Sequence, residues 1–232
     1  FIMTQFKSWR LNLVTSFLVL GMLFNIPQAL AKTQMDNPSI IEKPLVLTVG
    51  DTFVYKRYQN LNDAKEGRNS SATFFRKVTE VYEDGGYRLK IGDSSGYILY
   101  YHSGNVIEKN KNGLTKEIYS PSSSTYRYPM RVGDKFNVSY YLTRINNTTV
   151  SRDGVVRVIG WETITVPAGT FKVLRIEVSG DYELLGSSSG SFKQTYLISP
   201  QIKMRPVLYI YKAEWESGSL NIFISLSKFH VK

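Results

Sequence analysis

Apolar and polar residues alternate along much of the chain, and the alternation is clearest in two stretches. Between residues 135 and 142, one set of alternate positions is apolar or aromatic: Phe136, Val138, Tyr140 and Leu142. Between residues 220 and 226 the same spacing recurs in Leu220, Ile222, Ile224 and Leu226. A period of two places successive side chains on opposite faces of an extended chain, so each stretch predicts a strand with one buried face.

Short segments rich in Gly, Asn, Asp and Ser separate these runs. The segments EDGG at 83–86, KNG at 111–113 and ESGS at 216–219 predict hairpin turns, because these residues tolerate positive φ. About twelve strands fit between such signals, and only 60–67 predicts a short turn of helix. The sequence therefore predicts an all-β fold, a curved antiparallel sheet that forms a half-barrel or a barrel-like structure.

One ten-residue stretch occurs twice in similar form. VGDTFVYKRY begins at Val49, and VGDKFNVSYY begins 83 residues later at Val132. In both copies a second glycine follows 36 residues after the first, at positions 86 and 169. We expect two structural repeats, about 45–128 and 129–232, with turns built on Gly50, Asp51, Gly133, Asp134, Pro167 and Gly169. The alternative is that VGD is a common way to enter a strand and that the rest is chance.

The N-terminal segment has the pattern of a secretory signal peptide. If Met3 is the start, two basic residues precede an uncharged apolar run at 11–24, and Ala29-Leu30-Ala31 follows as a cleavage site. A transmembrane anchor is the alternative, but about 14 apolar residues fall short of the roughly 20 that cross a bilayer. We expect cleavage after Ala31, a single all-β domain at 32–232, and a periplasmic or secreted protein that is not integral to the membrane after processing.

The amino-acid composition excludes several kinds of covalent and metal chemistry and favours one kind of binding partner. The chain has no cysteine, which excludes disulfides, thiolate metal sites and the lipid attachment of standard lipoproteins. Its formal net charge is +10, and removal of the signal peptide with Lys7 and Arg10 leaves +8. A basic exported protein favours anionic envelope components over nucleic acid. A solvated surface that only keeps the protein soluble is the alternative reading of this charge.

Candidate catalytic residues form no convincing motif. GDSSG at 92–96 and GSSSG at 186–190 match a nucleophile elbow, but each precedes a predicted strand, whereas the elbow requires a helix. Two distant histidines, His102 and His230, make a poor metal site. Four strand carboxylates remain open for a two-acid hydrolase: Glu162, Glu177, Glu214 and Glu216. We expect no metal, no cofactor and no enzymatic activity.

The stretch WETITVPAGTFKVLRIEVSG at 161–180, with YPMRVGDKF at 128–136 and QTYLISPQIKM at 194–204, resembles the TapB-like group of exported bacterial proteins of unknown function. The resemblance covers about 129–212, and SPQIKM stands where that group has a glycine turn. It implies fold-level similarity to half-barrel carriers of the LolA–LolB type, whose concave apolar face holds acyl chains. Those carriers close the concavity with helices, which this sequence hardly predicts.

These observations favour an exported protein that binds a lipid-like or anionic envelope component without catalysis. We expect ligand contacts near Tyr97, Leu99, Tyr140 and Leu142, where the two halves should approach. The alternatives are a structural or interaction protein with a filled core, a carboxylate-based hydrolase and, last, an outer-membrane barrel. The sequence leaves the ligand and the oligomeric state open.

Overall fold

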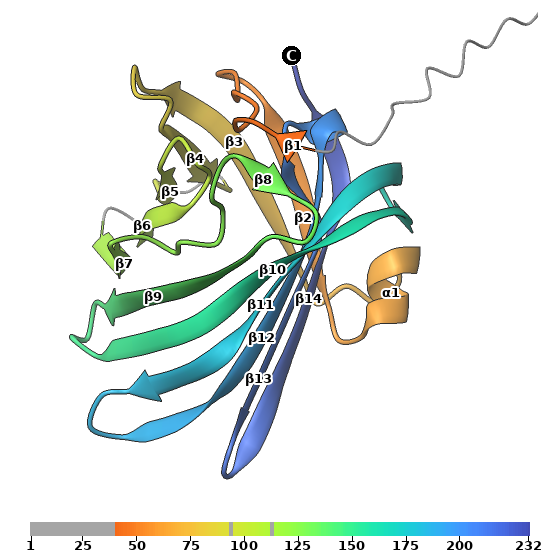
Figure 1. The fold of residues 1–232 in the computed structure, drawn as a ribbon. Helices are drawn as coiled ribbons and strands as arrows, with labels where there is room; N and C mark the ends of the chain where they lie inside the picture. The colour runs from red at the N-terminus through yellow and green to blue at the C-terminus, as the bar shows by residue number, and fades with distance from the viewer. Residues whose placement is uncertain (1–39, 93–94, 112–113) are drawn as a thin grey trace, which may run out of the picture. The chain divides into compact units, whose positions relative to one another are not determined.

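The computed structural model describes residues 40–92, 95–111 and 114–232 (Figure 1). The predicted signal peptide and its predicted cleavage site at Ala31 lie outside the described residues. The described part is almost entirely β-structure, which confirms the all-β prediction. Its helices are a short α-helix, α1 (Leu61–Glu66), and one 3-10 turn, η1 (Pro200–Ile202).

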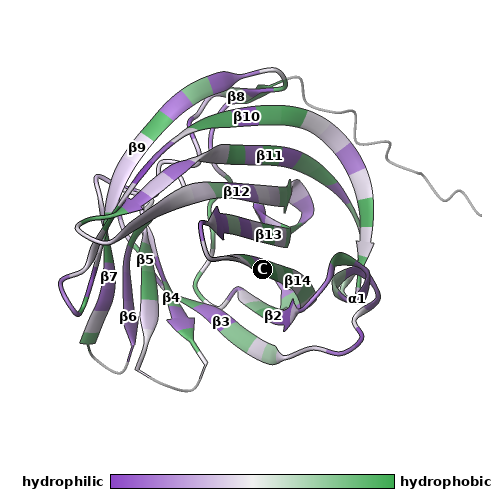
Figure 2. Ribbon diagram, turned by 90° about the horizontal axis from the view of Figure 1, so that it is seen from below, coloured by the Kyte–Doolittle hydropathy of each residue, from purple (hydrophilic) through white to green (hydrophobic). Residues whose placement is uncertain are grey.

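Twelve antiparallel strands in this part of the chain close into a barrel (Figure 2). The first half contributes β2 (Thr52–Tyr58), β3 (Ala72–Val81), β4 (Tyr87–Ile91), β5 (Tyr97–Tyr100), β6 (Val106–Lys111) and β7 (Leu114–Ser120). The second half contributes β9 (Lys135–Arg144), β10 (Thr149–Val166), β11 (Gly169–Leu184), β12 (Ser188–Ser199), β13 (Arg205–Trp215) and β14 (Gly218–His230). Within each half, strands adjacent in sequence pair with each other.

Two pairings between the halves close the barrel. Strand β7 pairs with β9, and β14 pairs with β2. These pairs decide between the two predicted forms, because a half-barrel would leave two free edges and the barrel leaves none. Two short strands, β1 (Ile40–Ile41) and β8 (Met130–Arg131), form a separate two-stranded sheet.

The two VGD turns make the same backbone hydrogen bonds. The N–H of Gly50 donates to the carbonyl oxygen of Val78 at 2.9 Å, and the N–H of Gly133 donates to that of Val158 at 2.8 Å. Each valine N–H donates in return to the carbonyl oxygen of the aspartate that follows the glycine, and the strand register shifts directly after each valine. Both glycines have positive φ, 99° and 93°. The origin of the halves as two repeats stays a prediction.

The chain builds α1 from local capping signals, as the sequence at 60–67 predicts. The side chain of Asn60 accepts a hydrogen bond from the N–H of Asp63, and Gly67 ends the helix in the left-handed conformation. The helix contacts β2, β10 and β14. Its Ala64 belongs to the same hydrophobic cluster as Tyr58, Leu208 and Phe223.

The same hydrophobic cluster includes the end of the long β10–β11 hairpin. Beyond a register shift at Gly160, Ile164 and Phe171 pack with Leu197 and Leu208. The predicted turn residues Pro167 and Gly169 lie at the tip of this hairpin, where Gly169 has φ 129°. The outer face of β12 and β13 is therefore buried, and the opposite face lines the barrel interior, which we call the lumen.

Candidate binding site in the barrel lumen

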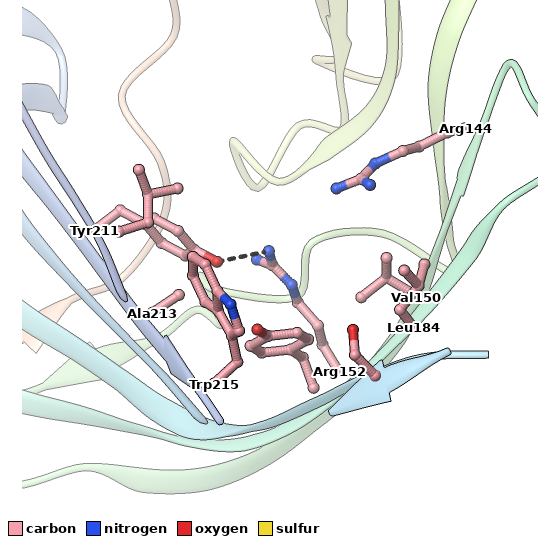
Figure 3. A pocket seen from close by; sticks show the side chains of 10 residues that line it. Arg144, Val150, Arg152, Leu184, Tyr211, Ala213 and Trp215 are labelled. Carbon is pink, nitrogen blue, oxygen red and sulfur yellow. Dashed lines mark hydrogen bonds between the residues drawn. The ribbon is translucent and has the colours of Figure 1, made fainter. Parts of the chain in front are cut away.

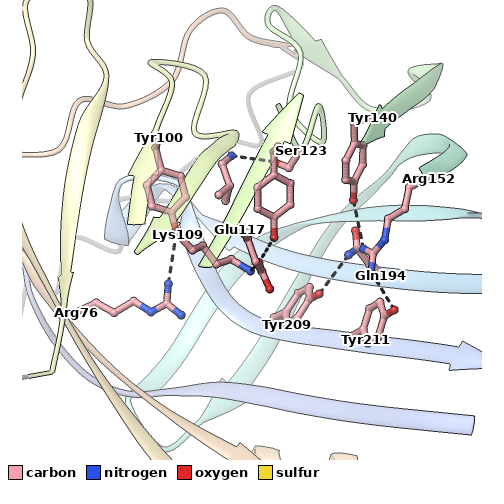
Figure 4. Close-up of polar contacts among 12 residues, drawn as sticks. Arg76, Tyr100, Lys109, Glu117, Ser123, Tyr140, Arg152, Gln194, Tyr209 and Tyr211 are labelled. Carbon is pink, nitrogen blue, oxygen red and sulfur yellow. Dashed lines mark hydrogen bonds and ion pairs between the residues drawn. The ribbon is translucent and has the colours of Figure 1, made fainter. Parts of the chain in front are cut away.

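Arginines occupy positions in the lumen that the alternation would assign to apolar residues. Arg76 lies in phase with Phe74 and Val78 on β3, and Arg152 lies in phase with Val150 and Val156 on β10. Because the parity of a strand fixes the face of each side chain, the apolar neighbours bring Arg76 and Arg152 inside the barrel. Arg205 begins β13, beyond a register shift at Val207, and lines the same interior space as Tyr209. Figure 4 shows Arg76 and Arg152 among tyrosines in the lumen.

Two of these arginines meet at one tyrosine hydroxyl. Nη1 of Arg76 donates to the hydroxyl of Tyr100 at 3.4 Å, and Nη2 of Arg205 donates to the same hydroxyl at 3.3 Å. Nη1 of Arg205 also donates to the hydroxyl of Tyr87 at 2.8 Å. The rings of Tyr87 and Tyr100 are stacked at 4.8 Å, and the Arg205 guanidinium lies 4.8 Å from the Tyr100 ring centre. The hydrogen bonds and the cation–π contact hold Arg205, which is only 8% exposed.

A cavity of about 250 Å³, the inner cavity, opens over this cluster. Its wall contains three cations, Arg76, Arg205 and Lys109, and no carboxylate among the described residues. Lys109 is already neutralised, because its Nζ lies 2.5 Å from Glu117 (Figure 4). Neither arginine forms an ion pair with a carboxylate in the described part of the chain. The inner cavity therefore carries two uncompensated positive charges.

The local electrostatics keep Arg205 and Glu117 charged. Burial alone would lower the pKa of Arg205, but Tyr87 and Tyr100 outweigh it and raise that pKa well above its ordinary value. Burial alone would raise the pKa of Tyr100, but the guanidinium groups of Arg205 and Arg76 outweigh it and lower that pKa. Burial also acts to raise the pKa of Glu117, and Lys109 reverses it, so this carboxylate stays ionised.

A second cavity of about 250 Å³, the mouth cavity, lies beside the hairpins that end β9, β11 and β13 (Figure 3). Arg152 projects into it and donates to the hydroxyls of Tyr140 at 3.3 Å and Tyr211 at 3.2 Å. Arg144 is its second cation, and no described carboxylate lines it. The rest of its wall is largely apolar or aromatic: Val150, Leu184, Ala213, Trp215 and Leu220, with Tyr182.

Polar side chains line the lumen between the two cavities. Gln194 donates to the hydroxyl of Tyr209 at 3.3 Å and accepts from that of Tyr196 at 3.2 Å. Both tyrosines line the inner cavity. Tyr211 lies two residues after Tyr209 on the same strand and lines the mouth cavity. Figure 4 shows Tyr209 and Tyr211 side by side on this wall. The lumen therefore presents a row of hydroxyl groups between two cationic ends.

The structure separates the four residues that the sequence suggested for ligand contact. Tyr140 and Leu142 are 4% exposed and point inward beside Tyr119 and Val150. Tyr97 and Leu99 lie on the face of β5 opposite Tyr100, and the Tyr97 hydroxyl donates to Glu108 instead. The prediction assigned Tyr97 and Leu99 to the wrong face of β5. All four residues of YILY are apolar or aromatic, so alternation could not identify the inner face.

The candidate catalytic residues do not gather in the lumen. The GSSSG segment spans the turn after β11 and the first three residues of β12, and the described ends of 92–96 join β4 to β5. Glu162 and Glu177 flank Arg175 in a cross-strand ion-pair ladder, with Arg175 2.8 Å from Glu162. His102 lies in a turn, and His230 ends β14. No group of three or more potential metal ligands occurs among the described residues.

Sequence reasoning missed the three lumen arginines. The signal that could have found them is a cation in the apolar phase of a predicted strand, as in FFRKV at 74–78. A cation at such a position means either that the face assigned as buried is in fact exposed, or that the charge is buried. A buried charge needs a polar or oppositely charged partner.

The comparisons with known proteins give two structural matches. A crystal structure of a candidate lipoprotein from Parabacteroides distasonis ATCC 8503 matches with a TM-score of 0.47 and 16% identity, over 82% of this chain and all of that one. A candidate exported protein with a YmcC-like fold from Bacteroides fragilis NCTC 9343 matches with a TM-score of 0.42 and 12% identity, again over 82% of this chain and all of that one.

No protein-family model and no curated protein sequence matches the chain. The resemblance to the TapB-like group and to LolA–LolB carriers therefore stays a prediction. Among the described residues, no helix has the length and apolar character needed to span a bilayer.

Proposed function

We propose that this protein binds an anionic, amphipathic molecule in the lumen of its barrel, without catalysis. The observation that carries the proposal is the composition of the two cavity walls. Together they contain five cationic side chains and no carboxylate among the described residues: Arg76, Lys109 and Arg205 in one, Arg144 and Arg152 in the other. Of these five, Lys109 alone forms an ion pair with a carboxylate of the described residues, that of Glu117.

The energetics of burial support this reading. A cation removed from water without a counter-charge costs several kcal/mol, roughly, even after the protein relaxes around it. Tyrosine hydroxyls and ring faces offset part of this cost for Arg152 and Arg205, but they carry no full negative charge. An anionic ligand would supply the missing charge in a site of low dielectric constant.

The walls of the mouth cavity support an apolar portion in the same ligand. Trp215 and Leu220 are 37% and 38% exposed at the open end, where a bound chain would cover them. An acyl chain would gain about 0.8 kcal/mol for each methylene group that it buries there. The proposed ligand is therefore a lipid-like anion of the cell envelope, with its charged end toward the arginines.

The proposed location is the periplasm or the extracellular space. It rests on the signal-peptide pattern that ends at Ala31. The expected mature protein begins at Lys32, and the intact mass of protein recovered from the secreted or periplasmic fraction tests this. A chain that keeps residues 1–31 and fractionates with the inner membrane would contradict it.

The binding proposal is tested with a fluorescent fatty acid and with native mass spectrometry of protein isolated from an envelope extract. We expect saturable probe binding and a co-purifying lipid mass that organic solvent releases. Leu220→Asp should weaken probe binding, because it places a carboxylate on the apolar wall. Tyr141→Asp is the matched control, since Tyr141 is 52% exposed on the outer face of β9. Absence of both probe binding and co-purified lipid would favour a structural or interaction role instead.

A further inference from the structure

We propose that the inner cavity is a phosphate site, in which Arg76, Arg205 and Tyr100 hold the phosphate group of the ligand. This assignment deepens the proposed function and rests on it, because it names the anionic group that the lumen takes. The shared chemistry is a tetrahedral oxyanion, whether it belongs to a lipid head group or to free phosphate.

The first support is a set of buried donors without partners around one space. Nε of Arg76, Nε of Arg205 and the hydroxyl of Tyr55 are buried and have no well-formed hydrogen bond, and all three residues line the inner cavity. Buried polar groups without partners are rare in native proteins, because each loses its hydrogen bonds to water and gains none in return. Three of them at one cavity point to a ligand that accepts hydrogen bonds.

The second support is the direction from which the donors come. Arg76 comes from β3 and Arg205 from β13, strands that β2 and β14 separate in the barrel. Both guanidinium groups reach the hydroxyl of Tyr100, so they bracket one point from two sides. A carboxylate offers two oxygens in one plane, whereas a phosphate offers three or four in a tetrahedron. Donors that converge from separate walls suit the tetrahedral group.

The third support is the remaining donor capacity of the same wall. The Oγ of Ser123 already accepts from the N–H of Val106 at 2.8 Å, which leaves its own proton available to donate.

The fourth support is the net charge of the cavity wall, which suits a phosphate group. With Lys109 neutralised by Glu117, Arg76 and Arg205 supply two positive charges, which match a phosphate monoester at neutral pH.

The test is isothermal titration of the full-length mature protein with inorganic phosphate, dodecyl phosphate and dodecanoate. We expect dodecyl phosphate to bind at least about tenfold more tightly than dodecanoate, since a phosphate offers the arginines more charge and more acceptor oxygens than a carboxylate does. Arg76→Gln and Arg205→Gln should each reduce that affinity about tenfold or more and leave dodecanoate less affected. Arg88→Gln is the matched control, because Arg88 lies on the outer face of β4 and pairs with Glu80 at 2.7 Å.

The two ligand sources give different results. Tight binding of dodecyl phosphate alone identifies a lipid head group, and equal binding of inorganic phosphate identifies free phosphate; either result supports the site. If dodecanoate binds as tightly as dodecyl phosphate and Arg76→Gln changes neither, the phosphate site is overturned while the proposed function stands. Phosphate binding without any amphiphile binding keeps the site and overturns the proposed function. Absence of all binding overturns both. Arg76 is half-buried, so its variant decides the test even if Arg205→Gln does not fold.

Discussion

Nζ of Lys203 lies 2.8 Å from Oδ2 of Asp51, a carboxylate that is completely buried in the first VGD turn. Oδ2 also accepts from the N–H of Thr48, and Oδ1 accepts from the backbone N–H of Lys232. The carboxylate therefore joins three distant parts of the chain. Asp134, its counterpart in the second VGD turn, accepts from the N–H of Arg131.

We predict that Asp51→Asn lowers the free energy of unfolding by about 3 kcal/mol, because it leaves Lys203 without its anion in a largely buried position. Asp134→Asn is the matched control and should lower it by less than about 1 kcal/mol, since a neutral amide still accepts the turn hydrogen bond. Urea unfolding of the two variants measures the difference. Equal losses would show that the turn, and not the ion pair, stabilises the fold.

The same ion pair predicts a loss of stability in acid. Burial alone would raise the pKa of Asp51, but hydrogen bonds from Lys203, Lys232 and Thr48 outweigh it and hold that pKa below its usual 3.8. A folded pKa below the unfolded one gives a stabilisation that is complete above pH 3.8 and is lost as the pH falls through the folded value. The wild type should therefore lose more stability than Asp51→Asn below that pH.

Gly133 tests the backbone requirement of the repeated turn. Its φ is 93°, and a Cβ placed there would meet no atom within 4 Å. A substitution therefore changes backbone strain alone. We predict that Gly133→Val lowers the free energy of unfolding by about 1–3 kcal/mol. Gly133→Asn should lower it less, because Asn tolerates positive φ better than a β-branched residue. A neutral Gly133→Val would contradict the backbone explanation of the repeated glycine.

Local sequence signals were enough for much of the fold. Alternation placed Val138, Tyr140 and Leu142 on the buried face of β9, and Gly-rich turns marked the hairpins that follow β3 and β13. Barrel closure was not readable in the same way. The pairs β7–β9 and β14–β2 join residues far apart in sequence, and their register depends on the shape of the whole sheet.

The candidate site was less predictable than the fold. Tyr140 was placed correctly because polar residues flank it, whereas the face of Tyr97 could not be read from the uniform run YILY. Arg205 precedes a proline and begins its strand, so no alternation before it sets its phase. Its meeting with Arg76 at Tyr100 depends on three strands that only the closed barrel brings together.

A substitution of Arg152 can distinguish a role in ligand binding from a role in the stability of the fold. It is a cation among the tyrosines of the lumen, where burial alone would lower its pKa and Tyr140 and Tyr211 reverse that effect. We predict that Arg152→Met binds the fatty-acid probe more weakly, yet keeps or raises the free energy of unfolding, by up to about 1 kcal/mol, because a well-packed apolar residue often replaces a buried charge at no loss.

The matched control for this prediction is Arg157→Met. Arg157 belongs to the opposite face of β10 and donates to the hydroxyl of Ser179 at 3.1 Å. Its substitution should leave probe binding unchanged. A large loss of stability in Arg152→Met, with probe affinity intact, would mean that this arginine has a structural role only.

Tyr100 offers a spectroscopic readout of the inner cavity. Its pKa lies below the ordinary value of 10.0, because the guanidinium groups of Arg205 and Arg76 outweigh its burial. Burial raises the pKa of Tyr126 and Tyr209, which line the same cavity, well above that value. In an ultraviolet absorbance titration we therefore expect an early tyrosinate signal that Tyr100→Phe removes. Tyr97→Phe, on the outer face of the same strand, should leave it in place.

Saturating phosphate should then move this signal. A phosphate dianion beside the phenol adds negative charge and neutralises the two guanidinium groups that favour ionisation. The pKa of Tyr100 is therefore expected to rise toward or above 10.0 in its presence, while an equal concentration of chloride, matched for ionic strength, should leave it unchanged. If phosphate binds and the Tyr100 titration does not shift, the anion occupies another part of the molecule, because a charge within hydrogen-bond distance of Arg76 and Arg205 must act on the hydroxyl to which both of them donate.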